Sequence, residues 1–313
     1  MRGKRARLLC IGDLALDIVV RTPAAAGVEE GTDVPGTIRF RAGGSAANTC
    51  RAFAGLGGMA TFVGAVGSDA LARRLVAATR AEGVTVRAVT RPGPTARLMV
   101  ILGPTGERSF VTDRGVADAL RPADLKPAWP QRIEVLHLPA YSLLAKPLSD
   151  AAVRAASSAH NAGALVSVDL ASRRPLLTAG VSRVRQQIAE VKPDIIFGNQ
   201  VEAAALAGRQ SLRRIVDLAP IVVIKEGVAG CRVLWRADAP TEVLEIEVAT
   251  KPVPTTDTTG AGDAFDAGYL HWLVANDHGP DSPRRAAVLR RAALAGHRAA
   301  ARLLTSARPE LVL

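Results

Sequence analysis

The sequence predicts an α/β fold in which a mainly parallel central sheet is covered by helices on both faces. Three observations lead to this class. Short apolar runs, of the kind that form strands buried on both sides, alternate along the chain with longer helical patterns. The 313 residues are 48% hydrophobic, which is enough for one large core. No internal repeat or low-complexity linker divides the chain, so we expect a single domain over residues 1–313.

The expected elements follow in chain order. The strands of the central sheet are predicted at the short apolar runs Leu8–Gly12, Thr61–Val66, Val135–Leu138, Ala164–Leu170, Asp194–Gly198 and Ile221–Lys225. The covering helices are predicted at Ser45–Leu56, Asp69–Glu82, Leu148–Asn161, Val181–Glu190, Val201–Ala207, Leu212–Leu218 and Ala264–Ala275. Asp69 and the pair Ser282 and Pro283 indicate helix starts, because a side-chain oxygen caps the first N–H groups and proline fits the first turn.

Two regions break this alternation. Ile18–Arg21 and Thr37–Arg41 have the pattern of two strands with a Pro- and Gly-containing stretch between them. Thr95–Leu102 and Arg108–Thr112 have the same pattern and are joined by the hairpin turn sequence of residues 103–107. These strand pairs either decorate an edge of the main sheet or form a separate small sheet, and the residues alone leave both arrangements open.

The charge pattern bears on possible partners. The chain carries a formal net charge of +11, but its arginines are dispersed, often in pairs such as Arg73–Arg74 and Arg290–Arg291. A nucleic-acid surface usually has a contiguous basic patch or a reading motif, and neither is evident. We therefore expect no nucleic-acid partner and assign the charge to solvated helix faces, where it can still steer anionic nucleotides toward the protein.

Cysteine usage and hydropathy exclude further classes. The three cysteines Cys10, Cys50 and Cys231 are widely separated, which suits neither a disulfide framework nor a CxxC metal site. No apolar stretch is long enough to span a bilayer. The basic residues at the N-terminus run directly into the first strand, without the apolar segment of a signal peptide. We expect a cytoplasmic protein without a membrane partner.

The motif with the clearest chemistry lies near the C-terminal end. Residues 257–263 read Asp-Thr-Thr-Gly-Ala-Gly-Asp and run directly into a predicted helix. Gly260 and Gly262 lack a Cβ and let a ligand approach the main chain. The first N–H groups of the helix have no internal partner and attract a phosphoryl group. Asp263 would repel a resting phosphate but can take a proton from a hydroxyl that attacks it, which indicates a small-molecule kinase. A turn with a helix cap is the structural alternative.

Other nucleotide-binding motifs do not occur. The Walker pattern GxxxxGK[ST] and the His-Arg-Asp catalytic loop of protein kinases are both missing from the sequence. The P-loop and protein-kinase classes are therefore excluded by their own motifs.

A second glycine-rich pattern lies far upstream. Residues 43–50 read Gly-Gly-Ser-Ala-Ala-Asn-Thr-Cys and are followed by Ala52 and by Leu-Gly-Gly at 56–58. Together with the motif at 257–263, this pattern resembles the two signatures of the ribokinase-like, or PfkB, carbohydrate kinase family. The resemblance implies a ribokinase-like three-layer sandwich with a small β-sheet lid, whose strands would come from about residues 17–42 and 94–113. The lid would fold over the acceptor and mediate a homodimer.

The resemblance also implies roles around the transferred phosphate. Asp263 would be the catalytic base, and Thr258 would add a hydroxyl donor at the mouth of the anion hole. Asp257 matches the family position that helps to bind a monovalent cation such as K⁺, although an N-cap-like role for this carboxylate stays open. The anion hole itself would consist of Gly260, Ala261 and Gly262.

A third set of residues matches the nucleotide half of that family. Residues 199–202 read Asn-Gln-Val-Glu after a predicted strand, which matches the family motif Asn-x-x-Glu. The match implies that Asn199 lies at the nucleotide phosphates and that Glu202 binds Mg²⁺ through water. A helix cap with a glutamate three residues later would look the same. Lys225 would contact phosphate or ribose, and Gly227 would allow close backbone approach.

The acceptor side is predicted around the end of the first strand and the upstream glycine pattern. By the resemblance, the carboxylates of Asp13 and Asp17 would accept hydrogen bonds from sugar hydroxyls. Gly43 and Gly44 would let the main chain approach the sugar, and Asn48 can both donate and accept. Surface aspartates at a turn are the structural alternative for the two carboxylates.

Three departures from the ribokinase branch limit the choice of acceptor. Ser45 stands where that branch has lysine after the double glycine. Pro-Ala-Tyr-Ser at 139–142 follows the strand after which that branch places a sugar-binding glutamate. The family pattern Asp-x-Asn-x-Arg survives only as Asp-Leu-Ala-Ser-Arg at 169–173. We therefore do not expect ribose, and another sugar, a sugar acid or a nucleoside stays open.

The function expected from the sequence is transfer of the γ-phosphoryl group of ATP, with Mg²⁺, to a hydroxymethyl group of a sugar-like acceptor. A nucleoside kinase of the same fold is the alternative within the transferases. A catalytically silent sugar-binding regulator is the alternative from another class. Such a regulator would keep Asp17 and Asn48 but would have little reason to keep Asp263.

Overall fold

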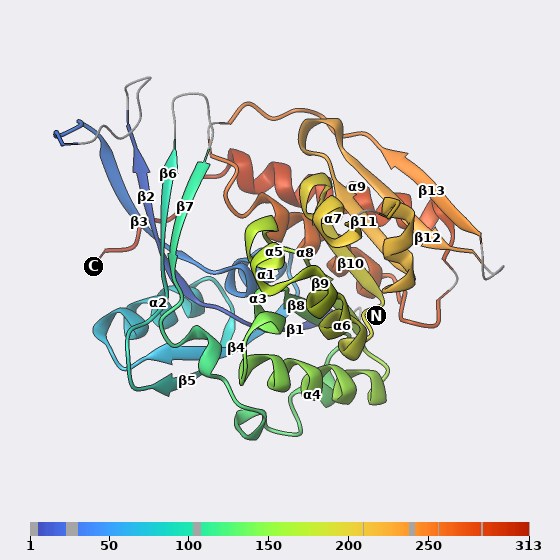
Figure 1. The fold of residues 1–313 in the computed structure, drawn as a ribbon, viewed down its shortest axis with the longest axis horizontal. Helices are drawn as coiled ribbons and strands as arrows, with labels where there is room; N and C mark the ends of the chain where they lie inside the picture. Colours follow the sequence, from blue (N-terminus) through green and yellow to red (C-terminus); the bar gives the residue numbers. More distant parts are fainter. Residues whose placement is uncertain are drawn as a thin grey trace.

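The computed structural model describes residues 6–22, 31–102, 108–208, 210–237, 242–255, 257–282 and 284–312. The strands of its large sheet are β1 Arg7–Ile11, β4 Met59–Gly67, β5 Thr85–Arg91, β8 Val135–Pro139, β9 Leu165–Asp169, β10 Ile195–Asn199, β11 Ile221–Lys225, β12 Cys231–Arg236 and β13 Val243–Val248. Within the described ranges their order is β13-β12-β11-β10-β9-β8-β1-β4-β5 (Figure 1). Neighbours from β11 to β5 pair in parallel, whereas β12 and β13 pair antiparallel at one end. The mainly parallel sheet expected from the sequence is confirmed.

The apolar runs of the sequence do not predict β5 and β13, the two end strands of this sheet, or β12, which lies between β11 and β13 and contains Arg232. Strand β13 reads Val-Leu-Glu-Ile-Glu-Val, and β5 also mixes charged or polar residues with apolar ones. End strands have one unpaired edge and partly solvated faces, so their residues alternate in polarity. The continuous apolar runs that predict the sheet belong to the strands from β11 to β4 in this order.

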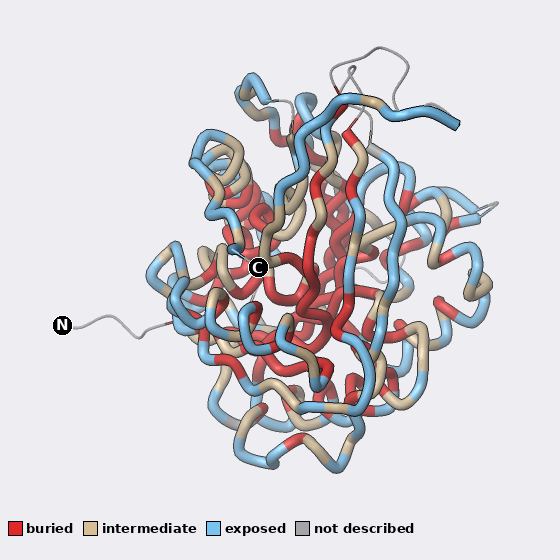
Figure 2. The backbone as a smooth tube through the Cα atoms, turned by 90° about the vertical axis from the view of Figure 1, so that its left-hand side faces the viewer, coloured by how far each residue is buried: buried red, intermediate tan, exposed pale blue. Residues whose placement is uncertain are grey.

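Helices cover both faces of the sheet. One face carries α1 Ser45–Gly55, α2 Ala70–Ala81, α8 Ala261–Ala275 and α9 Ala286–Thr305. The other carries α3 Tyr141–Leu144, α4 Leu148–Asn161, α5 Arg173–Ala179, α6 Val181–Val191 and α7 Gln200–Ala207. Each group of helices shares its own buried core with one side of the strands. Figure 2 shows the buried residues gathered in the interior of the molecule. The three-layer architecture expected from the sequence is confirmed.

Two helix predictions need correction. Leu212–Leu218 is not an α-helix but a 3₁₀ helix over Leu212–Asp217, because the segment is short and Pro220 follows it closely. Helix α9 begins at Ala286 and not at Ser282, whose Oγ accepts a hydrogen bond from Gly279 N–H at 2.9 Å and so closes the preceding turn. Pro283 lies outside the described residues. No helix in the described ranges is long and apolar enough to cross a membrane.

The two irregular strand pairs form a separate sheet. Its strands are β2 Ala15–Arg21, β3 Thr37–Gly43, β6 Arg97–Leu102 and β7 Arg108–Asp113, in the order β3-β2-β6-β7. Figure 1 shows this sheet projecting beside the large one, and we call it the lid. The predicted turn at 103–107 lies outside the described residues. The β2–β3 register sets Asp17 opposite Arg41 and Ala15 opposite Gly43, so acceptor-side residues of both motifs lie at one end of the lid.

The parallel strands bring distant residues together. Strands β1, β8, β9, β10 and β11 run in the same direction, so their carboxyl ends lie along one edge of the sheet. Asp13, Asp169, Asn199 and Lys225 lie at or just after these ends. The same edge is where open α/β sheets bind ligands.

Candidate active site

Asp263 lies in the first turn of α8 and is held by two side chains from α1. Ser45 Oγ donates a hydrogen bond to Asp263 Oδ1 at 2.6 Å, and Asn48 Nδ2 donates to Oδ2 at 2.9 Å. Ser45 and Asn48 are three residues apart in the helix and therefore share one face. The carboxylate is thus fixed between the first turns of two helices.

The surroundings of Asp263 bring its pKa into the range useful for a base. Burial raises this pKa, the hydrogen bond from Ser45 lowers it, and the nearby Asp169 carboxylate raises it, giving a value of about 6. Most molecules therefore carry the carboxylate at neutral pH. Each carboxylate oxygen has two lone pairs, so the two existing hydrogen bonds leave room for a hydroxyl donor. The residue is partly exposed, so such a hydroxyl can reach it.

The chain enters α8 through a tight turn. Gly260 precedes the helix with φ of 75°, a left-handed conformation that favours glycine. Ala261 N–H donates to Thr258 O at 3.1 Å, so this predicted anion-hole amide already has a partner within the turn. The following N–H groups of Gly262 and Asp263 have no acceptor within the helix and can bind an anion. We call residues 260–263 the anion turn.

Lys225, at the end of β11, lies beside the anion turn in a buried cluster of charges. Its Nζ is 3.1 Å from Asp266 Oδ1 and 3.3 Å from Asp169 Oδ1. Burial lowers the pKa of Lys225, but the carboxylates of Asp169 and Asp266 outweigh it and raise the pKa, so the ammonium stays charged. A Cβ on Gly262 would lie 3.2 Å from this Nζ. The ammonium therefore reaches the place where an anion would bind.

Asn199 and Glu202 form a reciprocal helix cap at the start of α7. Glu202 N–H donates to Asn199 Oδ1 at 2.9 Å, and Asn199 N–H donates to Glu202 Oε2 at 2.8 Å. The structural alternative for this motif is therefore present. Glu202 is nonetheless buried next to the charge cluster, and burial together with the Asp169 carboxylate raises its pKa. Its carboxylate thus adds negative potential beside Lys225.

The two other predicted nucleotide residues lie on exposed turns. Gly227 starts the 3₁₀ turn Gly227–Ala229 with φ of 60°, and no atom lies within 4 Å of where its Cβ would be. Thr258 is exposed in the loop before α8. Gly227 is therefore required by its backbone conformation, and the open space beside it is compatible with a ligand close to the main chain.

Asp17, in lid strand β2, faces a cavity. The side chain is buried, and among the described residues its Oδ1 has no hydrogen-bond partner. Burial raises the pKa of this carboxyl to about 7, although the charge of Arg51 opposes the shift. A buried oxygen without a partner is unfavourable unless a ligand supplies a donor. The cavity has a volume of about 190 Å³, and its lining includes Asp17, Arg41, Asn48, Arg51 and Gly260.

Gly43 and Gly44 accommodate the two acceptor-side aspartates. A Cβ at position 43 would lie 2.0 Å from Asp17 Oδ1, so only glycine leaves room for this carboxylate. Gly44 has φ of 94°, and a Cβ there would lie 2.5 Å from Asp13 O. Asp13 itself accepts a hydrogen bond from Ala46 N–H at 3.3 Å. The double glycine is thus explained by local packing as well as by close approach to a ligand.

Arg51 fixes the orientation of Asn48. Its guanidinium donates to Asn48 Oδ1 and to Ala42 O, the latter at 2.6 Å, and forms an ion pair with Glu82 at 3.4 Å. The Asn48 oxygen therefore has a donor, and its Nδ2 points to Asp263. Asn48, expected to contact the acceptor, also holds Asp263.

Asp257 pairs with arginines from two distant segments. Arg41 Nη1, from β3, lies 2.5 Å from Asp257 Oδ2, and Arg308 Nη1, from the segment after α9, lies 3.4 Å from it. Burial raises the pKa of Asp257, but the hydrogen bonds from Arg41 and Thr259 outweigh it and lower the pKa to about 2. The carboxylate is therefore charged at any working pH.

The structure adds residues to which the sequence assigned no role. Ser45, noted only as a departure from the ribokinase branch, donates to the proposed base. Asp266 lies one helical turn after Asp263, and Asp169 ends a predicted strand, so the spacing alone could have indicated both. Arg51 and Arg308 had no such indication, because their partners come from other elements.

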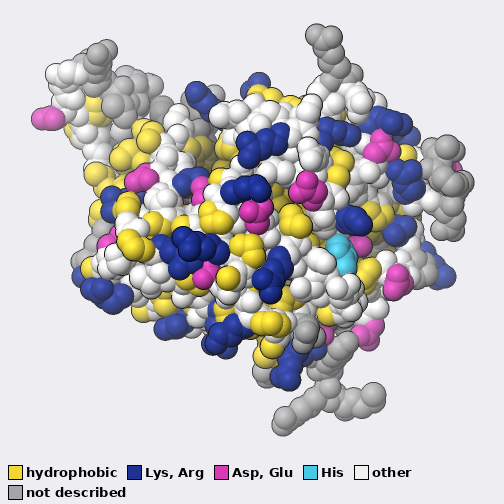
Figure 3. All heavy atoms as spheres, turned by 60° about the horizontal axis from the view of Figure 1, so that its bottom comes forward, with side chains coloured by type: hydrophobic (Ala, Val, Ile, Leu, Met, Phe, Trp, Pro, Cys, Tyr) yellow, Lys and Arg dark blue, Asp and Glu magenta, His cyan; other side chains and the backbone are white. Residues whose placement is uncertain are grey.

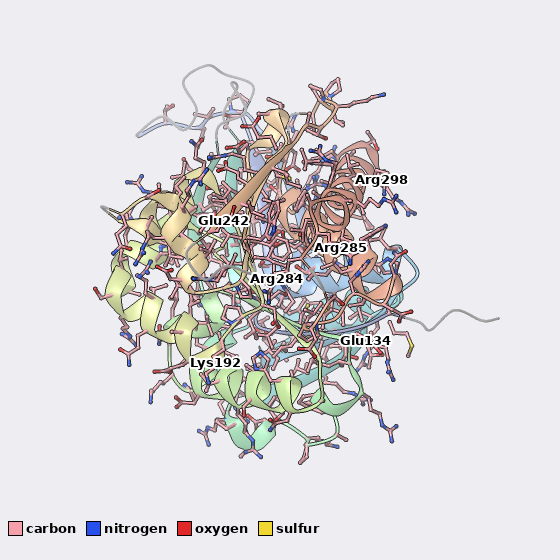
Figure 4. All side chains as sticks on the ribbon, turned by 90° about the vertical axis from the view of Figure 1, so that its right-hand side faces the viewer. Glu134, Lys192, Glu242, Arg284, Arg285 and Arg298 are labelled. Atoms are coloured by element: carbon pink, nitrogen blue, oxygen red, sulfur yellow. The ribbon has the colours of Figure 1, made fainter. Side chains whose placement is uncertain are left out.

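Charged side chains on the molecular surface are scattered. On the face drawn in Figure 3, Lys and Arg alternate with acidic and apolar side chains. Figure 4 labels Arg285 and Arg298 on or next to α9 and Lys192 at the end of α6, on separate parts of the surface. In the described ranges, no cluster of three or more His, Cys, Asp or Glu is arranged to hold a metal ion directly. The three cysteines are buried and free.

Known proteins are similar to this chain over most of its length. The chain matches the family model described as pfkB family carbohydrate kinase over residues 5–307. It is 32% identical over 286 residues to Fructokinase-1 of Oryza sativa subsp. japonica, covering 88% of this chain and 85% of the relative. The adenosine kinase of Sinorhizobium meliloti has a similar structure, with a TM-score of 0.80, 24% identity, and coverage of 98% of this chain and 96% of that one. The fructokinase of Xylella fastidiosa with bound ATP gives a TM-score of 0.78 at 23% identity, over 97% and 93% of the two chains.

These similarities agree with the site as built from its residues. The family match spans both glycine-rich motifs, and the similar structures confirm the ribokinase-like fold expected from the sequence. A carboxylate, an anion turn and a half-buried lysine lie close together in this site, and phosphoryl transfer can use groups of these kinds. The protein therefore belongs to the PfkB family of carbohydrate kinases.

Proposed function

We propose that this carbohydrate kinase transfers the γ-phosphoryl group of ATP to a primary hydroxymethyl group of an uncharged ketohexose, with fructose as the first candidate. Similarity supports the class of acceptor, because a relative called fructokinase is 32% identical over 88% of this chain. The observation that carries the proposal is the position of Asp263, which is held by Ser45 and Asn48 beside an anion-binding helix start.

The acceptor hydroxyl is activated by Asp263. Ser45 and Asn48 each occupy one lone pair of the carboxylate, and a free lone pair accepts the proton of the attacking hydroxyl. The pKa of about 6 keeps the group ionised at neutral pH while leaving it basic enough to take a proton during attack. The fixed orientation also removes the need to order the base at the moment of reaction.

The transferred phosphoryl group is stabilised by the anion turn and by Lys225. The N–H groups of Gly262 and Asp263 lie at the positive end of the α8 dipole, where charge develops on the phosphoryl oxygens. Lys225 adds an ammonium held in place by Asp169 and Asp266. This arrangement is set before the substrate arrives, which is what makes such stabilisation effective.

ATP and Mg²⁺ are the proposed cofactors. Asp169, Glu202 and Asp266 surround the single ammonium of Lys225, so the cluster attracts a divalent cation that arrives with the phosphates. This donor set fits a hydrated ion bound mainly by phosphates and water, with Glu202 and Asn199 beside it. When bound, Mg²⁺ neutralises charge on the phosphates.

The acceptor is proposed to bind between Asp17 and Asp263. Asp17 Oδ1 is buried without a partner among the described residues, and a sugar hydroxyl is a suitable donor for it. Asp13 lies just after the end of β1, and its carboxylate can accept a hydrogen bond from a second hydroxyl of the acceptor. An acceptor bound here presents a hydroxymethyl group to the base.

A nucleoside is the second candidate acceptor. The observation in its favour is the similarity to an adenosine kinase structure at a TM-score of 0.80. The silent-regulator alternative is disfavoured because Asp263 and its two donors would have no purpose in a protein that only binds sugar.

A homodimer through the lid is also part of the proposal. Ile38, Met99 and Val111 lie on one face of the lid by strand register and are 60%, 38% and 63% exposed. Covering such an apolar face with a second copy would stabilise the lid. A cytoplasmic location belongs to the same proposal, because the enzyme needs access to ATP.

The test is a screen for acceptor-dependent ADP release. Purified protein with ATP and Mg²⁺ is given fructose, other ketoses, aldoses, sugar acids and adenosine in parallel. We expect the highest kcat/KM with a ketohexose, and a turnover lower by roughly 10²–10⁴-fold in Asp263→Asn. A higher kcat/KM for adenosine would assign the protein to the nucleoside kinases, and a sugar acid as the best acceptor would refute the uncharged ketohexose. ADP release that needs no acceptor would refute the proposal.

A further inference from the structure

Asp257 starts the loop that leads to the anion turn, and its carboxylate and main-chain oxygens all accept donors from this chain. Oδ2 faces Arg41 Nη1 at 2.5 Å and Arg308 Nη1 at 3.4 Å. Oδ1 accepts from Thr259 N–H at 3.0 Å. The main-chain oxygen accepts from Arg308 Nη2 at 2.9 Å and from Thr255 Oγ1 at 3.2 Å.

Two guanidinium groups therefore share one carboxylate in a sheltered place. The side chains of Asp257, Arg41 and Arg308 are exposed by only 13%, 18% and 17%. A cation at this carboxylate would lie close to two positive charges, and water screens the repulsion poorly where the groups are largely buried. Oδ2 and the main-chain oxygen already accept two donors each, so a cation at either oxygen would have to displace one of them. The residues present thus do not fit the monovalent cation that the family resemblance implies at Asp257.

We propose that Arg41 and Arg308 take the place of a monovalent cation at Asp257 and act as positioning residues for the anion turn. Only two residues separate Asp257 from Gly260, where the turn begins, so a shift of Asp257 moves the amides that bind the phosphoryl group. Phosphoryl transfer by this chain then needs no K⁺. This inference rests on the proposed function, since the anion turn matters only if a phosphoryl group binds there.

The arginines also connect the anion turn with the lid. Arg41 lies directly opposite Asp17 in the β2–β3 register. The carboxylate proposed to bind the acceptor and the arginine that holds Asp257 therefore belong to the same pair of strands. Arg308 belongs to the C-terminal segment 306–312. This segment runs beside β3, where Leu311 N–H donates a hydrogen bond to Phe40 O at 2.7 Å (Figure 1). Strand β3 of the lid and the C-terminal segment beside it therefore carry the two arginines that hold the loop before the anion turn.

The first experiment compares cations in steady-state kinetics. Wild-type protein is assayed in choline chloride and then with K⁺ or Na⁺ at constant ionic strength, and we expect the same kcat and KM in all three. Arg41→Ala with Arg308→Ala should lower kcat by roughly 10- to 100-fold, the effect of losing charge-assisted hydrogen bonds. Addition of K⁺ or methylguanidinium to this double variant should restore part of kcat. Such rescue would not follow from a merely structural role.

Arg74→Ala is the matched control. Arg74 donates to Val312 O at 2.8 Å and so holds the same C-terminal segment without touching Asp257. It should leave the kinetics and the cation response unchanged. If Arg74→Ala reproduced the loss, anchoring of the segment and not the charge at Asp257 would be responsible, and the proposal would be wrong. Arg308→Lys keeps a positive charge and provides the test if the double variant fails to fold, with a smaller loss of kcat expected.

The second experiment needs no acceptor. The Tm of wild type and double variant is measured in choline, Na⁺ and K⁺, since a cation that binds the native state raises it. We expect K⁺ to raise the Tm of the double variant and not that of the wild type. Stabilisation or activation of the wild type by K⁺ would overturn the inference. Absence of kinase activity with the expected Tm pattern would instead refute the proposed function alone.

Discussion

Asp263→Asn is the most direct perturbation of the site, because the new side chain has nearly the same shape but cannot take a proton. In the wild type, Asp263 accepts from Ser45 Oγ at 2.6 Å and from Asn48 Nδ2 at 2.9 Å. The amide oxygen of the variant can still accept from Asn48, and Ser45 can rotate its hydroxyl proton and accept from the amide nitrogen. The fold and acceptor binding should therefore be retained.

The chemical step should be strongly affected. Removing a general base typically lowers turnover by roughly 10²–10⁴-fold, or about 3–5 kcal/mol in the activation barrier. In the wild type, turnover should also fall as the pH drops through about 6, since protonation of Asp263 removes the base. The variant should lose this pH dependence along with its activity.

Steady-state kinetics with ATP and acceptor varied separately, from pH 5 to 9, measure both effects. Ser45→Ala serves as the control, because it keeps the base and removes a hydrogen bond that lowers its pKa. Its acidic limb should move to higher pH while its turnover at alkaline pH stays close to native. Near-native turnover of Asp263→Asn, or an unchanged acidic limb in that variant, would refute the assignment of Asp263 as the base.

Three further predictions concern the surroundings of the base. Burial raises the pKa of Asp17 from 3.8 to about 7, so the cost of ionising it in the folded protein grows between these pH values and is complete above about 7. Asp17→Asn should raise the free energy of unfolding by at most about 4 kcal/mol at pH 8 and by less at pH 5, while increasing the KM for the acceptor; an equal gain at both pH values would contradict this. Gly43→Ala places a Cβ 2.0 Å from Asp17 Oδ1 and should raise the KM for the acceptor but not the KM for ATP. Steady-state kinetics in which each substrate is varied separately would test this. Lys225→Met leaves Asp169 and Asp266 without their ammonium and should lower the free energy of unfolding by about 3–5 kcal/mol. Urea unfolding at pH 7 measures this loss, and an unchanged stability would show that the ion pairs do not stabilise the fold.

Most of the central fold could be predicted because its signals are local. Interior strands such as Ile221–Lys225 are buried on both faces and therefore appear as continuous apolar runs. The strands of the lid also have a recognisable strand pattern in the sequence. Only the family resemblance indicates that they form a sheet separate from the main one. The edge strand Val243–Val248 was missed because partial solvation mixes Glu with apolar residues. The pattern at Leu212–Asp217 predicts an α-helix where the structure has a 3₁₀ helix, because periodicity does not distinguish the two over so few residues.

Parts of the site that depend on backbone chemistry and short spacing can be identified in the amino-acid sequence alone. Glycines at 260 and 262, followed by Asp263 and a helix, specify an anion-binding turn with a base, because their conformational freedom and the free N–H groups are local properties. Which side chains contact one another depends on the tertiary structure. Ser45 meets Asp263 across 218 positions, and Arg41 meets Asp257 across 216. Such contacts arise from the packing of separate elements, so the pKa values and the ion pairs that set the chemistry have no counterpart in the local sequence pattern.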